Sequence, residues 1–192
     1  ILLFERGAKV NARSDYGSTP LMYAAYGGQG EMVQLLLSQD AEVAAGDVFG
    51  RTALFRAAAQ GNAETVKQLL GAGAAPTACS RFFPSIVGIA AGGGHGEVVK
   101  ALLDHGASVG GVGGDVPLVR AAFGGHEKVV RLLLDRGGDI ESRSLSGFTA
   151  LGAAAVEGHL DTVRLLLARG ARIDHPGADQ RRTPLMLAAA RG

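Results

Sequence analysis

Residues 116–140 read VPLVRAAFGGHEKVVRLLLDRGGDI, and closely similar stretches recur along the chain. The stretch at 19–43, TPLMYAAYGGQGEMVQLLLSQDAEV, places its alanines, glycines and leucines in the same order. Copies begin at residues 19, 52, 85, 116 and 149, and the start of another copy lies at 183. These starts are 33, 33, 31, 33 and 34 residues apart. A period of this length is the signature of stacked structural repeats.

Each copy contains two short apolar segments with helical spacing. In the copy at 116–140, Leu118, Ala121 and Ala122 lie on one face of a first helix. Residues 129–134, apart from Arg131, form a broader apolar stripe on a second helix. The small alanines allow neighbouring first helices to approach closely. Because no copy can bury its apolar face alone, the copies must stack on one another. The sequence therefore predicts an all-α solenoid.

A residue that tolerates left-handed backbone angles follows each predicted helix. Gly125 follows the first helix of the copy at 116–140, and Gly137 follows the second. Most other copies also have glycine at these two places, whereas one copy has Asp40 after its second helix. Aspartate is among the few other residues that adopt this conformation, so we expect a left-handed turn there too.

The pattern resembles that of the ankyrin repeat family, T-P-L-H-x-A-A…G-H…V-V-x-L-L-L…G-A, over essentially the whole chain. The resemblance implies a single domain of helix–turn–helix repeats joined by finger-like β-turn loops. It divides the chain into a partial repeat at 1–14, complete repeats at 15–47, 48–80, 81–111, 112–144 and 145–178, and a partial repeat at 179–192. The family's histidine after T-P-L is missing throughout, and with it the hydrogen bonds that it usually makes. Its place is taken by Met22, Phe55, Gly88, Val119, Gly152 and Met186.

The composition excludes several classes of function. The net charge is +1, from 19 basic and 18 acidic residues, so nothing in the charge points to nucleic acid. Cys79 is the only cysteine, which rules out a disulfide within the chain and fits a reducing compartment. No apolar run approaches the roughly 20 residues that span a bilayer. We therefore expect a cytoplasmic or otherwise intracellular protein with no membrane contact.

The residue types that often act in catalysis or bind ligands recur at equivalent positions of the repeats, which indicates a structural role. His95, His126 and His159 occupy equivalent places at the start of second helices, where we expect them to bond the backbone of a turn. The stretch GGGHG at 92–96 is preceded by a helix rather than a strand, so it lacks the context of a phosphate-binding loop. An acidic residue recurs at the head of each second helix and complements the helix dipole. We predict no enzyme activity, no cofactor and no metal.

The resemblance implies that partners are proteins, which bind a concave side built from the fingers and the first helices. Because aromatic residues and arginine dominate protein interfaces, those at the inward positions are the candidates for partner contact. The predicted partner-binding residues are Tyr16, Tyr23, Tyr26, Phe49, Arg56, Phe82, Arg120 and Phe123. The fingertip aromatics among them, Tyr16, Phe49 and Phe82, have an alternative role in packing against neighbouring fingers.

Two regions depart from the regular array. Residues 80–115 carry extra glycines in or next to a first helix, namely Gly88, Gly92 and Gly93, and a shortened finger. Each glycine inside a helix costs about 1 kcal/mol relative to alanine, so this region is predicted to be the softest, either as a functional hinge or through sequence decay. Both ends of the chain fall within half-repeats, which predicts exposed apolar ends and self-association.

Taken together, these features predict a non-catalytic protein-interaction module that binds a protein partner on its concave surface. Two other interpretations stay open: a targeting or regulatory segment of a larger enzyme or signalling protein, and a structural spacer.

Overall fold

The computed structural model describes residues 6–77, 85–111, 115–174 and 183–189. It is all-helical over these ranges apart from turns, bends and isolated bridge residues such as the pair Gly46 and Thr52. The first helices of the repeats are α2 (Pro20–Tyr26), α4 (Ala53–Ala59), α6 (Ile86–Gly92), α8 (Pro117–Phe123), α10 (Ala150–Val156) and α12 (Pro184–Ala189). The second helices are α3 (Gly30–Ser38), α5 (Ala63–Gly71), α7 (Gly96–Asp104), α9 (Glu127–Asp135) and α11 (Leu160–Ala168). The predicted fold class is confirmed.

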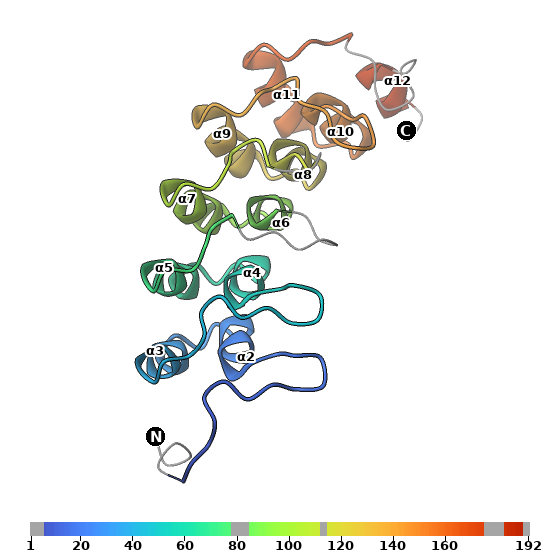
Figure 1. The fold of residues 1–192 in the computed structure, drawn as a ribbon. Helices are drawn as coiled ribbons and strands as arrows, with labels where there is room; N and C mark the ends of the chain where they lie inside the picture. The colour runs from blue at the N-terminus through green and yellow to red at the C-terminus, as the bar shows by residue number, and fades with distance from the viewer. Residues whose placement is uncertain (1–5, 78–84, 112–114, 175–182, 190–192) are drawn as a thin grey trace. The chain divides into compact units, whose positions relative to one another are not determined.

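The chain divides into two compact units, Ile1–Ile86 and Val87–Gly192. In unit 1, α2 packs beside α4 and α3 beside α5 (Figure 1). In unit 2, α8 packs beside α10, and α7, α9 and α11 follow one another (Figure 1). Helices of one kind thus pack on helices of the same kind within each unit, as stacked repeats require. The boundary between the units lies within the predicted soft region 80–115, whose softness stays a prediction.

A threonine hydroxyl starts several of the first helices. Thr19, Thr52 and Thr149 have extended backbones, and each Oγ1 accepts a hydrogen bond from the amide three residues on. This bond satisfies one of the free N–H groups at the helix start. The residue whose amide donates to the threonine stands where the family has its histidine. In α2 this residue is Met22, and its side chain is fully buried. In α2, an apolar side chain of the core therefore replaces the family's histidine.

The core of each unit is made of alanines from the first helices and branched aliphatic residues from the second. The fully buried side chains include Ala25, Ala58, Val33, Leu69, Ala122, Val130, Leu133, Ala154 and Leu166. The expected left-handed turns are also confirmed, because Gly125, Gly137 and Asp40 all have positive φ, Asp40 at 58°. Asp40 is the only non-glycine residue with this conformation in the described ranges.

Gly88 lies in α6 at a place where a side chain has no room. A Cβ atom built on Gly88 would collide with the carboxylate of Asp115, which also pairs with Arg120. A Cβ on Gly92, at the end of the same helix, would meet only the Cβ of Arg120 at 3.6 Å, an ordinary contact. The sequence predicted a penalty for glycine at both positions, and the structure supplies a reason for Gly88 alone.

We expect Gly88→Ala and Gly92→Ala to have opposite effects on stability. Gly92→Ala should raise the free energy of unfolding by up to about 1 kcal/mol, because alanine favours the helix. Gly88→Ala should lower it by about 1 kcal/mol, because overpacking outweighs the same gain. Urea unfolding followed by circular dichroism measures both. In the Gly88→Ala background, Asp115→Ala should restore stability; no restoration would contradict the steric explanation.

Candidate protein-binding surface

The fingers between repeats are tight hairpins. In the fingers at 14–18, 47–51 and 144–148, the amide of the first residue donates to the carbonyl of the fifth at 3.0–3.1 Å. The side chain of the first residue closes the turn from the other side. Ser14 Oγ accepts from the Ser18 amide at 3.1 Å, and Asp47 Oδ1 accepts from the Arg51 amide at 2.9 Å. Each finger therefore presents the residues at its tip on a fixed support.

Unit 1 exposes four of the predicted aromatic side chains. Tyr16 is 67% exposed, Tyr23 58%, Tyr26 55% and Phe49 41%. Tyr23 and Tyr26 lie one turn apart on α2, and Tyr16 lies at the tip of the preceding finger. Burying large aromatic side chains away from water is favourable, so rings as exposed as these often mark a surface that a partner covers. We call Tyr16, Tyr23, Tyr26, Phe49 and Val48 the aromatic surface.

Val48 belongs to this surface although sequence reasoning did not select it. It is exposed and directly precedes Phe49 at the tip of the finger. Its amide donates to the carbonyl of Tyr16 at 3.0 Å, which joins the two fingers through their backbones. A valine carries no sequence signal for binding, since the same residue type fills the core. Its position next to a predicted fingertip aromatic was the one available clue.

Arg56 forms hydrogen bonds and an ion pair within the chain. Its Nη2 donates to the hydroxyl of Ser18 at 2.7 Å and to Oδ2 of Asp47 at 2.9 Å, and its side chain is only 15% exposed. Its guanidinium also lies 5.8 Å from the centre of the Tyr23 ring, within the range of a cation–π interaction. Arg56 thus supports the aromatic surface from beneath, and its own free surface is small.

Asp47 is the centre of this support and was missed by the sequence analysis. Its side chain is fully buried, and Oδ2 also accepts from Nε of Arg51 at 2.8 Å. Arg51 in turn places its guanidinium 4.8 Å from the centre of the Phe49 ring. One buried carboxylate therefore holds two arginines, and each arginine stacks on one exposed ring. The sequence feature that could have revealed Asp47 is its residue type, because the equivalent position is serine in the fingers at 14–18 and 144–148.

Opposing effects act on the pKa of Asp47. Burial raises the pKa of this carboxyl group, because it penalises the charged form. Hydrogen bonds from the backbone amides of Arg51 and Phe49 and from the Arg56 and Arg51 guanidinium groups act against burial, and the net effect lowers the pKa below the usual value for aspartate. Asp47 is therefore ionised at neutral pH, and its charge is compensated inside the protein.

The remaining predicted residues lie elsewhere. Phe123 ends α8 in unit 2 and is exposed, as is Arg120, which pairs with Asp115. Phe82 lies outside the described residues. In unit 2 the structure adds Leu145, which is 85% exposed at the tip of the finger at 144–148. The structure thus brings together the unit 1 members of the predicted set and places Arg120 and Phe123 three residues apart on another helix.

Two of the three recurrent histidines, His126 and His159, bond the backbone, as predicted. Nε2 of His126 lies 2.9 Å from the carbonyl oxygen of Gly92, and Nε2 of His159 lies 2.9 Å from that of Phe123. Because a carbonyl only accepts, each Nε2 carries the proton. The bonds reach the end of the first helix in the preceding repeat, and Asn62 makes the same connection by donating to Ala25 and Tyr26. These side chains tie neighbouring repeats together.

Within the described residues, no group of three or more histidine, cysteine or acidic side chains is arranged to hold a metal ion. Among the helices of those same residues, none is long and apolar enough to cross a membrane.

Comparisons with known proteins agree with the repeat pattern. A family model described as ankyrin repeats in three copies matches residues 1–80, 79–144 and 137–192, and these matches span the whole chain. The crystal structure of the human ASB11 ankyrin repeat domain is similar, with a TM-score of 0.91 and 27% sequence identity. The similarity covers 100% of this chain and 86% of that one. None of the curated proteins searched matches the chain.

Proposed function

Since the chain belongs to the ankyrin repeat family, whose repeats generally serve as protein-binding modules, we propose that it binds a protein partner through its fingers and first helices, and that the aromatic surface is the principal contact. The observation that carries this proposal is the exposure of Tyr16, Tyr23 and Tyr26, which are all the tyrosines of the chain, within a single unit.

The support beneath these rings favours a binding role over simple exposure. Tyr23 rests on Arg56 and Phe49 on Arg51, and Asp47 fixes both arginines. Rings that are held in place lose little conformational freedom when a partner covers them, which favours affinity. Tyrosine also offers a hydroxyl group for hydrogen bonds at an interface. We therefore assign contact to the exposed rings and a positioning role to Arg56.

Unit 2 carries a separate proposed contact on α8. Arg120 and Phe123 on α8 in unit 2 are exposed and belong to the residue types that dominate interfaces. Phe82 stays in the predicted set. No catalytic step is assigned to any of these residues, and we propose an interaction module without enzyme activity of its own within this chain.

The proposal is tested by capturing partners with the full chain and measuring the affinity of each for variants. We expect Tyr23→Ala and Tyr26→Ala each to weaken binding by about 2 kcal/mol, or roughly 30-fold, because exposed tyrosines at the centre of an interface commonly contribute this much. Isothermal titration calorimetry measures the change. Leu160→Ala is the matched control, because Leu160 is equally exposed but lies on a second helix.

A structural spacer would behave differently. It would yield no captured protein whose affinity depends on the tyrosines. Binding that survives both substitutions within twofold would remove the aromatic surface as the contact, whatever the partner proves to be.

A further inference from the structure

Arg56 has hydrogen-bonding capacity that the chain itself does not use. Its Nη2 donates to the Ser18 hydroxyl at 2.7 Å and to Oδ2 of Asp47 at 2.9 Å. Its Nε is buried and has no hydrogen-bond partner. Its Nη1 makes no hydrogen bond within the described part of the chain and is not buried, so it belongs to the 15% of the side chain that water reaches. Because a guanidinium group carries five N–H donors, Arg56 can bind a further acceptor through Nη1.

The charge around Arg56 favours an anion as that acceptor. The Asp47 carboxylate is shared between Arg56 and Arg51, so one negative charge faces two positive ones. Both arginine side chains are mostly buried, and water therefore screens this positive charge less than it would on an open surface. A hydrogen bond between charged groups is also about twice as strong as one between neutral groups. A carboxylate at Nη1 of Arg56 thus gains both a hydrogen bond and an ionic attraction.

The Tyr23 ring disfavours a basic partner. The centre of this ring lies 5.8 Å from the Arg56 guanidinium. A lysine or arginine of a partner on the other face of the ring would be repelled by Arg56, because the two charges have the same sign. The exposed rings of Tyr23 and Tyr26 are still open to apolar side chains. The segment that fits this part of the aromatic surface is therefore apolar and acidic.

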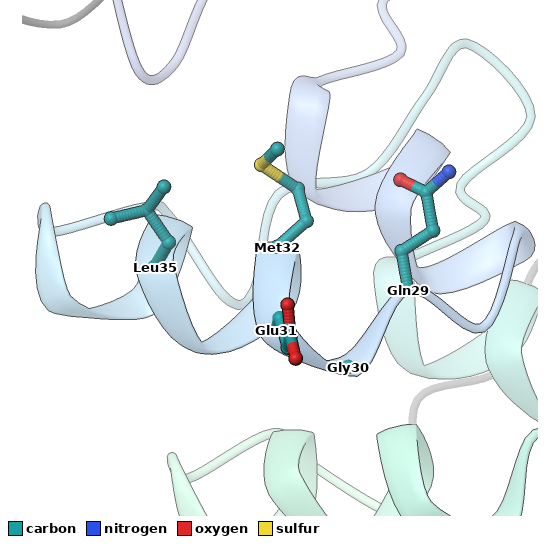
Figure 2. A pocket seen from close by; sticks show the side chains of 5 residues that line it. All are labelled: Gln29, Gly30, Glu31, Met32 and Leu35. Carbon is teal, nitrogen blue, oxygen red and sulfur yellow. The ribbon is translucent and has the colours of Figure 1, made fainter. Parts of the chain in front are cut away.

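A second apolar area in unit 1 carries the opposite charge. The hollow on α3 is lined by Gln29, Gly30, Glu31, Met32 and Leu35, and Figure 2 shows Met32 and Leu35 projecting from the same side of the helix. The charged member of this lining is Glu31, whose carboxylate repels an acidic segment. Charge therefore directs an acidic segment to the aromatic surface rather than to the α3 hollow.

We propose that the partner of the aromatic surface is a protein segment in which apolar side chains flank a glutamate. The glutamate carboxylate accepts a hydrogen bond from Nη1 of Arg56, and the flanking residues cover Tyr23 and Tyr26. Glutamate fits better than aspartate, because its longer side chain reaches a nitrogen of a mostly buried residue. This inference rests on the proposed function, since it names the partner of the same surface. Arg56 then has two roles, to position Tyr23 and to receive the glutamate.

Peptides selected on the full chain test the inference. A random peptide library displayed on phage is selected against the chain, and fluorescence polarisation measures the affinity of enriched peptides for the wild-type chain and for Tyr23→Ala. We expect the peptides that depend on Tyr23 to carry a glutamate among apolar residues. Replacing this glutamate by glutamine should weaken binding about tenfold, as the loss of one hydrogen bond between charged groups does. The glutamine peptide tests the charge without any change to the chain.

A double-mutant cycle tests whether the glutamate lies on Arg56. Arg56→Gln removes the positive charge, whereas Arg51 and two backbone amides still bind Asp47. We expect the glutamate and glutamine peptides to bind this variant with equal affinity. A general effect of Arg56→Gln on the Tyr23 ring weakens both peptides alike and cancels in the cycle. Circular dichroism verifies that the variant is folded.

Two further variants are the matched controls. Arg13→Gln removes a positive charge from another ion pair of unit 1, the exposed pair with Glu42, and should keep the tenfold difference between the peptides. Met32→Ala shortens an exposed apolar side chain in the α3 hollow and should leave both affinities unchanged.

The outcomes separate this inference from the proposed function. Peptides that depend on Tyr23 but carry no glutamate, or whose glutamate can be replaced without loss, would overturn the inference and leave the aromatic surface as the contact. A tenfold difference that persists in Arg56→Gln would do the same. A selection that enriches no peptide dependent on Tyr23 would also overturn the inference, and the captured proteins would then decide the proposed function separately.

Discussion

Replacing Asp47 by alanine is expected to lower the free energy of unfolding by about 3 kcal/mol, because it leaves Arg56 buried without its counter-charge. The Asp47 side chain is fully buried, and it accepts hydrogen bonds from two backbone amides and two guanidinium groups. Asp47→Asn keeps the shape and should recover only the part that comes from the backbone hydrogen bonds. Urea unfolding followed by tyrosine fluorescence measures the change, since all three tyrosines lie in unit 1 and the chain has no tryptophan.

The matched control is Glu42→Ala. Glu42 pairs with Arg13 at 3.4 Å in the same unit, but both side chains are about half exposed. An exposed pair of this kind contributes at most about 1 kcal/mol. An Asp47→Ala variant no less stable than the Glu42→Ala variant would show that the buried network contributes nothing.

The effect of Asp47 should depend on pH in one direction. The pKa of Asp47 is lowered in the folded protein, whereas an unfolded aspartate titrates near about 3.9. The stabilisation is therefore fully present above the unfolded pKa and is lost as the pH falls through the lower folded pKa. The difference in unfolding free energy between the wild-type chain and Asp47→Asn should be constant above about pH 5 and shrink below about pH 4. A constant difference down to pH 3 would contradict the assignment.

Leu133→Ala is the second change with a large expected effect, a loss of about 2–5 kcal/mol in the free energy of unfolding. Leu133 lies in α9 and is fully buried, so removing its side chain leaves a cavity between helices. Leu132→Ala, one residue away on the same helix, is the control, because Leu132 is only half-buried. Its loss should be clearly smaller. Urea unfolding followed by circular dichroism at 222 nm measures both, and equal losses would contradict the assigned core.

The repeat made much of this structure predictable. The apolar spacing within residues 129–134 and the turn residues act within one or two helical turns, so they can be identified in a linear sequence. Asp40 is a particular case, because its place in the repeat predicted a left-handed backbone without any homologue, and its φ of 58° confirms it. His126 was predicted to bond a turn, but the structure shows that the turn belongs to the preceding repeat.

The candidate surface was predictable only in part. The exposure of Tyr16, Tyr23 and Tyr26 agrees with their repeat positions. Arg56 was selected by the same rule, yet its guanidinium is occupied by Asp47, nine residues earlier in the chain. That pairing depends on how the finger folds back over α4, which residue spacing does not reveal. A charged side chain at an inward position can face a partner or a buried carboxylate, and the pattern does not distinguish the two.

The sequence by itself determined the all-α repeat fold, the turn residues that follow its helices and the family, because the apolar spacing and the turn residues recur every 31–34 residues. The tertiary structure alone decided how individual side chains are used. It paired Asp47 with two arginines and placed the Asp115 carboxylate over Gly88. The pairing of Asp47 with Arg56 and the approach of Asp115 to Gly88 join different elements of the chain, and such contacts exist only once the helices and fingers have packed.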